Sequence, residues 1–192
     1  MPVHRIIFPL LLTLLTLTGC TDRSFVSIAP EPTNYAWWLR AEFNPFHDAI
    51  RGIPVGKISK AWCKATEFTS DLFPRELLFE NGKDSLAASG VAFAVEGHFD
   101  YSKNVLQAMV GVYQTCGGEK GTFLLVIEPR QQASAEIRFL EEFPSTRQFA
   151  ALRLLPDSSI ELWWCLECDD SQQLKWSKPD RSFIWVPTDD DN

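Results

Sequence analysis

Short segments in which apolar and polar residues alternate constrain the fold of this 192-residue chain more than any other feature. Over residues 91–99 the apolar residues fall on one side of an extended chain, which predicts a half-buried strand. Further strands are predicted over residues 105–115, 122–128, 135–141, 148–155, 159–165 and 182–186. The connecting segments are short and rich in turn residues, whereas a parallel crossover needs a dozen or more residues. The sheet is therefore predicted to be antiparallel.

A helical pattern precedes these strands. From Ile58 to Leu72 the apolar residues recur at steps of three and four, which is typical of one face of a helix, and Pro74 follows. The sequence therefore predicts an α+β fold, in which an N-terminal helical region packs on an antiparallel meander sheet of six or seven strands. An all-β barrel or sandwich is the alternative if this helix does not form.

The first nineteen residues have the order of a secretory signal peptide. A short stretch ending in Arg5 is followed by an apolar run over residues 6–17 and by the small residues Thr18 and Gly19. The run is well short of the roughly 20 apolar residues that a helix needs to cross a bilayer. A retained transmembrane anchor is therefore not expected.

The segment Leu17-Thr18-Gly19-Cys20 resembles the lipobox of bacterial lipoproteins. The resemblance implies cleavage before Cys20 and attachment of a diacylglycerol to its thiol. Two or three acyl chains hold a protein stably on a membrane, so the expected partner of Cys20 is the membrane. Because Thr21, and not Asp, follows the cysteine, the resemblance favours the outer membrane over the inner one.

The sequence divides into four parts. Residues 1–19 are predicted to be the signal peptide, 20–34 a lipid-anchored tether, 35–188 a single globular domain, and 189–192 a solvated acidic tail. Apolar residues at 45% and charged residues at 22% are ordinary for a globular protein. The formal net charge of −7 repels phosphate backbones, so no nucleic-acid partner is predicted.

Four cysteines remain once Cys20 is assigned to the lipid. Cys63, Cys116, Cys165 and Cys168 form an even set, and the lipoprotein motif places them in an oxidising compartment. They are therefore disulfide candidates. Four cysteines allow three connectivities, and the sequence alone does not choose among them.

The segment Trp164-Cys165-Leu166-Glu167-Cys168 resembles, at three positions, the redox motif of the thioredoxin family. That chemistry places the first cysteine at a helix N-terminus, where its pKa is lowered. Here the motif ends a predicted strand, and the acidic residues that follow disfavour a thiolate. One close pair of cysteines also falls short of the two pairs usual in structural zinc sites, so no metal and no cofactor are predicted.

Few other residues suggest catalysis. Glu96 and His98 share the solvent side of one predicted strand, as a base and its orienting carboxylate would, but an exposed ion pair is the better interpretation. The hydrolase, metalloprotease, phosphate-loop and dinucleotide motifs do not occur. No catalytic residue is therefore predicted, and the chain is expected not to be an enzyme.

Tryptophan is unusually frequent, with seven residues in the chain. Trp163, Trp164, Trp176 and Trp185 are a possible binding surface, although core packing is the more common role of such residues. The sequence thus predicts a cell-envelope lipoprotein facing the periplasm, which serves as a non-enzymatic binding, inhibitor or immunity module for a protein or for a glycan such as peptidoglycan. The alternatives are a thiol-redox factor or hydrolase, and a structural role in envelope assembly.

Overall fold

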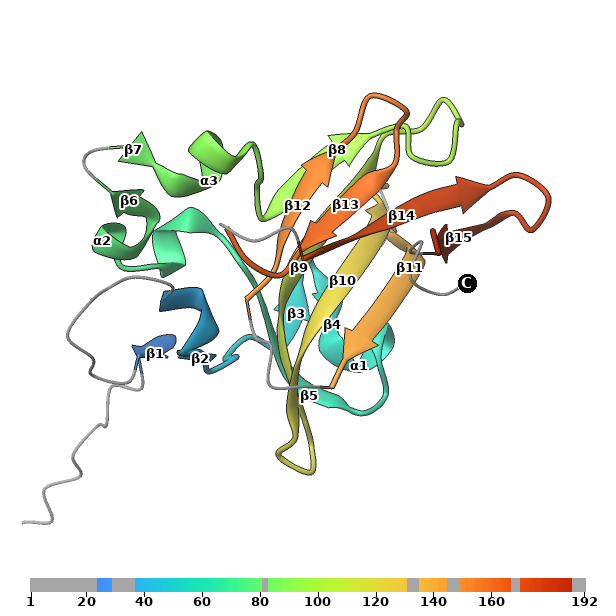
Figure 1. Cartoon of the computed structure of the whole chain (residues 1–192). Coiled ribbons are helices and arrows are strands. Elements are labelled where there is room, and N and C mark those ends of the chain that lie inside the picture. Colours follow the sequence, from blue (N-terminus) through green and yellow to red (C-terminus); the bar gives the residue numbers. More distant parts are fainter. Residues whose placement is uncertain are drawn as a thin grey trace, which may run out of the picture.

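The computed structural model describes residues 24–28, 37–80, 83–130, 135–144, 149–166 and 170–187. Within them the chain is mostly β, with two open antiparallel sheets that pack against each other (Figure 1). The first sheet contains β5 (Trp62–Glu67), β8 (Ala94–Gly97), β9 (Leu106–Thr115), β10 (Lys120–Glu128) and β11 (Glu136–Phe143). The second contains β12 (Ala151–Leu154), β13 (Ile160–Trp163), β14 (Ser171–Ser177) and β15 (Ser182–Trp185).

The long central strands β9 and β10 are buried on both faces. On one face, Val110 and Leu124 pack in a core that includes residues of the second sheet. On the other face, Met109 and Leu125 pack against a short covering segment. This segment consists of β3 (Ala49–Ile50), β4 (Ile53–Pro54) and α1 (Val55–Ile58). Burial on both sides explains why these two strands are almost continuously apolar.

The two sheets are joined at one corner. Ala92, two residues before β8, forms an isolated antiparallel bridge with Leu152 of β12. The two residues exchange both backbone hydrogen bonds, at 2.8 and 2.7 Å. This bridge therefore links the segment before β8 of the first sheet to the edge of the second sheet.

The N-terminal part of the domain adds a cluster of aromatic side chains at one end of the core. Phe43 and Phe68 have ring centroids 4.8 Å apart, and Phe73 stacks on Phe93 at 4.8 Å. Several short elements carry or flank this cluster: β1 (Val26–Ile28), η1 (Trp37–Leu39), β2 (Ala41–Phe43), η2 (Ser70–Leu72), α2 (Arg75–Leu78), β6 (Phe79–Glu80), β7 (Lys83–Asp84) and α3 (Ser85–Ser89).

The predicted α+β fold is wrong. Residues 58–72, predicted to form one helix, instead contain the end of α1, the strand β5 and the short helix η2. The longest helix in the described part of the chain has five residues, and none there is long and apolar enough to span a membrane. The first sheet is therefore covered by a second sheet and by short segments, and both sheets are open, so the closed-barrel alternative does not hold either.

A β-bulge explains why β5 has the sequence pattern of a helix. The pairing with β9 skips Cys63, because Trp62 lies opposite Thr115 and Lys64 lies opposite Gln114. The extra residue places Trp62 and Ala65 in the same core, although residues three apart normally face opposite sides of a strand. Phe68, three residues further on, is buried in the other core. Because this segment is buried on both sides, its apolar residues recur at steps of three, as they do in a helix.

The strand predictions agree better with the structure. The antiparallel arrangement is confirmed, and each predicted strand beyond residue 90 overlaps an observed one. The sequence analysis missed β14, in which the consecutive polar residues Gln172 and Gln173 interrupt the apolar alternation. Within the range predicted to be a tether, residues 26–28 form β1, and residues 20–23 and 29–34 lie outside the described part.

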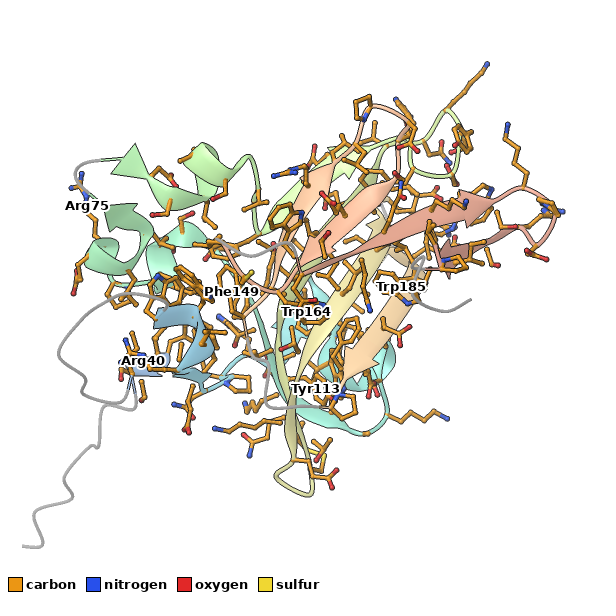
Figure 2. The ribbon with its side chains drawn as sticks, viewed as in Figure 1. Arg40, Arg75, Tyr113, Phe149, Trp164 and Trp185 are labelled. Carbon is orange, nitrogen blue, oxygen red and sulfur yellow. A yellow bond between two sulfur atoms is a disulfide. The ribbon has the colours of Figure 1, made fainter. Side chains whose placement is uncertain are left out.

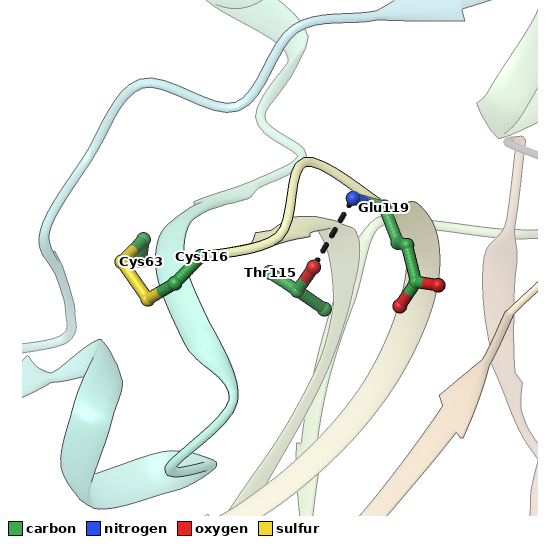
Figure 3. Close-up of a disulfide and its surroundings, with 4 residues drawn as sticks. All are labelled: Cys63, Thr115, Cys116 and Glu119. Carbon is green, nitrogen blue, oxygen red and sulfur yellow. Dashed lines mark hydrogen bonds between the residues drawn. A yellow bond between two sulfur atoms is a disulfide. The ribbon is translucent and has the colours of Figure 1, made fainter.

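The bulge is also where a disulfide is attached (Figure 3). Cys63 bonds to Cys116, which directly follows β9 and donates its backbone N–H to Ala61. The turn after Cys116 is closed by the Glu119 amide, which donates a 3.1 Å hydrogen bond to the Thr115 hydroxyl. The disulfide therefore ties the start of β5 to the β9–β10 hairpin.

Gly111 lies where the backbone of β5 approaches β9 closely. β5 and β8 pair with different parts of the same edge of β9, and Gly111 lies in the part paired with β5. A Cβ atom at this position would lie 2.2 Å from the Thr66 carbonyl oxygen and 2.7 Å from the Phe123 ring. Only glycine fits here, since the nearest atom belongs to the backbone.

Removal of the disulfide should destabilise the domain substantially. The bond spans 53 residues, and loop-closure entropy for a loop of this size corresponds to about 4 kcal/mol of unfolding free energy. We expect the variant carrying Cys63→Ser and Cys116→Ser to lose about this amount in urea denaturation followed by tryptophan fluorescence. An unchanged denaturation midpoint would contradict the role assigned to this bond.

Replacement of Gly111 should be far more costly than replacement of Gly56. The Gly111→Ala variant should lose about 3 kcal/mol of unfolding free energy, because its methyl group displaces the backbone of β5. The matched control is Gly56→Ala in α1, where a Cβ meets nothing within 4 Å and a gain of up to about 1 kcal/mol is expected. Similar thermal midpoints for the two variants would refute the close approach.

Candidate functional site

Three loops meet at one end of the two sheets, in the upper right of Figure 1. They connect β8 to β9, β12 to β13, and β14 to β15. We call these loops, residues 98–105, 155–159 and 178–181, together with Leu154 at the end of β12, the loop end. Tyr101 joins all three loops: its hydroxyl donates a 3.4 Å hydrogen bond to the Asp157 carbonyl, and the Lys178 ammonium lies 4.6 Å from the centre of its ring. Segments far apart in sequence thus form one continuous surface.

The β8–β9 loop is fixed to the sheet below it by Arg138 of β11. The guanidinium donates to the Asp100 carboxylate at 3.0 Å and to the Glu128 carboxylate at 2.6 Å. Glu128 also accepts a 2.9 Å hydrogen bond from the Asn104 side chain. The Asp100 side chain is only 4% exposed, so this is a buried attachment and not a mobile surface ion pair. Arg138 is therefore a positioning residue for the loop.

Asp100 is held in its charged form. Burial works to raise the pKa of its carboxyl group, but hydrogen bonds from Ser102 and the charge of Arg138 together outweigh burial. The net result is a pKa below the ordinary value for aspartate. The Asp100–Arg138 attachment is therefore intact at neutral pH and weakens only in acid.

Side-chain hydrogen bonds also fix the other two loops. In the β12–β13 loop, the Ser159 hydroxyl and amide both donate to Asp157, and these bonds lower the pKa of Asp157. In the β14–β15 loop, the Ser177 hydroxyl donates to Asp180 at 2.6 Å. Each loop is thus held by a carboxylate that accepts bonds from a nearby residue.

Backbone strain is concentrated in these loops. In the described part of the chain, four residues other than glycine have a positive φ angle, and three of them are Tyr101 (58°), Ser158 (67°) and Arg181 (52°). One lies in each loop. Such residues are uncommon, and they persist where the surrounding structure fixes the backbone. The loop end is therefore conformationally defined.

Exposed apolar groups also gather there. Among the described residues, five large hydrophobic side chains are clearly exposed, and three belong to the loop end: Tyr101 at 56%, Val105 at 47% and Leu154 at 41%. Single exposed apolar residues are normal, but a cluster is typical of an interaction site. The loop end is therefore the best candidate functional site.

The predicted tryptophan surface is divided between different environments. Trp163 lies on the outer face of the second sheet, where the Arg153 guanidinium covers its ring at 4.3 Å and its Nε1 donates to Glu161 at 2.7 Å. Trp164 is only 8% exposed and packs against Phe143.

Trp176 and Trp185 are half-buried and belong to the packing between the second sheet and β11. The Trp176 ring lies 5.1 Å from Phe183, and Trp185 lies near Phe139 and Phe143. Figure 2 shows Trp164 and Trp185 near the middle of the molecule, away from the loop end. The four tryptophans therefore do not form a single exposed platform.

The structure pairs two of the four predicted cysteines. Cys63 and Cys116 are bonded to each other. Cys165 is 3% exposed and is also disulfide-bonded. Cys20 and Cys168 both lie outside the described part of the chain.

Glu96 and His98 each bind a different residue. The Glu96 carboxylate accepts a 2.7 Å hydrogen bond from Gln107. The Nδ1 atom of His98 lies 3.0 Å from the carbonyl oxygen of Asn104, within the β8–β9 loop. Glu96 and His98 therefore make two separate structural contacts.

A hollow of about 330 Å³ beside α3 offers little chemistry. Its polar wall contains Arg51 and Glu67, which form a two-bond ion pair with N–O distances of 2.8 and 2.5 Å. The remaining carboxylate, that of Asp84, accepts hydrogen bonds from the first amides of α3. Among the described residues, no group of three or more His, Cys, Asp or Glu is placed to hold a metal ion.

Comparison with known proteins gives no match. No family model, no curated protein and no solved structure matches this chain. The candidate site therefore depends on the geometry alone.

The order of strands and turns along the chain could have predicted which loops form the loop end. In an antiparallel meander, alternate turns lie at the same end of the sheet. The turns after residues 99 and 155 are visible in the sequence, but the pattern of residues does not show that they lie together. The pattern also fails to predict β14, and with it the third loop.

Removal of the Arg138 guanidinium should release the β8–β9 loop. We expect Arg138→Met to increase hydrogen exchange at the amides of residues 98–105, because Asp100 and Glu128 lose their shared partner. In the unaltered protein, the protection of these amides relative to their intrinsic exchange rate should fall as the pH falls below about 4, since a lowered pKa stabilises the folded form only while the carboxyl group is charged.

The matched control is Arg130→Met. Arg130 pairs with Glu136, but both side chains are about half exposed, so the variant should change exchange in the loop very little. Equal exchange in the two variants would show that Arg138 does not position the loop.

Proposed function

We propose that this chain is a non-enzymatic envelope lipoprotein that binds a protein partner through the loop end. The lipobox-like segment Leu17–Cys20 supports membrane attachment through Cys20, with the domain facing the periplasm. The observation that carries the binding role is the combination of exposed apolar side chains and a fixed backbone at the loop end. An inhibitor or immunity protein needs this kind of surface.

The chemistry of the loop end suits a protein partner. Tyrosine and arginine are enriched at the energetic centres of protein interfaces, and Tyr101 and Arg181 are both exposed here. Loops that are already ordered lose little conformational entropy on binding, so more of the contact energy appears as affinity. The hydrogen bonds made by Arg138, Ser159 and Ser177 supply this order.

A glycan partner has less support. Sugar rings stack on the exposed faces of aromatic side chains. The face of Trp163 is covered by Arg153, and Trp164 is buried. The exposed aromatic ring of Tyr101 already has a cation on it. A protein surface is therefore the better interpretation.

The catalytic alternatives also have less support than binding. Thiol exchange requires an accessible sulfur, and Cys165 is almost completely buried. Glu96 and His98 contact different residues, so they do not form a base with its orienting carboxylate.

Photo-crosslinking in intact cells tests the proposed binding role. With benzoylphenylalanine at position Val105, we expect a discrete covalent adduct with one envelope or secreted protein. Addition of Tyr101→Ala should weaken the complex about tenfold or more, the loss usual for an aromatic residue at the centre of an interface, and should remove most of the adduct.

The control places the same crosslinker at Lys57 in α1, an exposed residue on the covering segment and outside the loop end. An adduct of equal yield at both positions, or one that is insensitive to Tyr101→Ala, would refute the loop end as the binding site.

A further inference from the structure

The start of the folded domain lies close to the lipid anchor. Only residues 21–23 separate Cys20 from Ser24, where the described structure begins. Four residue steps of fully extended chain span at most about 14 Å. If Cys20 is lipidated, as the proposed function states, Ser24 therefore stays within this distance of the membrane surface.

Ser24 is attached rigidly to the domain. β1 pairs with β2 over three residue pairs, and the Phe25 carbonyl accepts a 2.9 Å hydrogen bond from the Asn44 amide. The Asn44 side chain donates to the Ser24 carbonyl at 3.3 Å. The domain therefore cannot move away from the anchor as it would on a long flexible linker.

The ring of Phe25 adds a second attachment. It packs at 5.4 Å from Phe43 and at 6.1 Å from both Phe68 and Phe73, within the aromatic cluster. Separation of β1 from the domain would expose these rings to water. The short distance to Cys20 therefore fixes which side of the domain lies nearest to the membrane.

The remaining exposed apolar residues lie on that side. Of the five clearly exposed large hydrophobic side chains in the described part, the two outside the loop end are Leu39 at 73% and Phe46 at 46%. They flank β2, and Phe46 also contacts the Phe25 ring at 5.8 Å. Figure 2 labels Arg40, the residue after Leu39, at this edge of the molecule.

We infer that the face formed by β1, β2, Leu39 and Phe46 contacts the surface of the lipid bilayer. Apolar side chains at such a face enter the boundary between headgroups and acyl chains, and they add to the attachment that the lipid provides. Glu42 is exposed on β2, paired with Ser27, and its negative charge does not favour anionic headgroups, so the contact depends on Leu39 and Phe46 and not on anionic lipids.

This orientation determines where the loop end lies. Figure 1 shows β1 and β2 at the lower left and the three loops at the upper right, so the molecule separates the two regions. With β1 and β2 on the membrane, the loop end projects away from it. The exposed apolar groups thus divide between a membrane face and a binding end.

A fluorescent label at position 39 tests this inference in the full chain. The protein is expressed with its own signal peptide, purified in its lipidated form and reconstituted into phosphatidylcholine vesicles. An environment-sensitive dye on Leu39→Cys should shift its emission to the blue, and lipids carrying a nitroxide near the headgroup should quench it. The Leu39 side chain is largely exposed, so the substitution should leave the fold intact.

The matched control carries the same dye on Leu154→Cys, an exposed apolar position at the loop end, where no shift and no quenching are expected. Mass spectrometry of the N-terminal peptide separates two kinds of failure. A lipidated protein in which both labels behave alike overturns the membrane face and leaves the anchor intact. An unmodified Cys20 overturns the anchor and the face together.

A third result would assign the face to a different partner. If the label at position 39 shifts to the blue without vesicles, and the shift depends on protein concentration, a second copy of the chain covers this face. That result would also overturn the membrane contact.

Discussion

Burial of β9 and β10 on both faces is the constraint on which the rest of the structure depends. Each apolar face must pack against another part of the domain. The second sheet packs on one side, and the segment from β3 to α1 packs on the other. The turn between β3 and β4 is tight, with Arg51 and Gly52 both at positive φ, so that this cover stays short. The disulfide and Gly111 then hold β5 against the edge of β9.

Much of the sheet structure could be predicted, because a strand carries its apolar residues on the face that is buried, and this produces an alternating pattern in the sequence. The strands that were found have apolar residues on the faces where a cover lies. β5 could not be recognised, because the bulge at Cys63 converts its two-residue period into steps of three. β14 was missed for another reason: the polar Gln172 and Gln173 come before its buried Leu174, at the edge of the covered area.

The candidate site was less predictable than the fold. Its residues come from three loops, and only the pairing of strands shows that Tyr101, Asp157 and Lys178 meet. The number of tryptophans predicts a binding surface, yet Trp164, Trp176 and Trp185 pack the second sheet against β11. The positive φ angles that mark the loops have no reliable sequence signal outside glycine, since Tyr101, Ser158 and Arg181 are ordinary turn or surface residues.

Whether an even or an odd number of strands is added or lost decides at which end of the sheet the following turns lie. The hairpins β12–β13 and β14–β15 both place their turns at the loop end, while the turn of the β9–β10 hairpin lies at the other end. Insertion or loss of a whole hairpin would preserve this separation, whereas gain or loss of one strand would bring the next turn to the opposite end. Changes by whole hairpins would therefore remodel the loop end and leave β1 and β2, on the opposite side of the molecule, as they are.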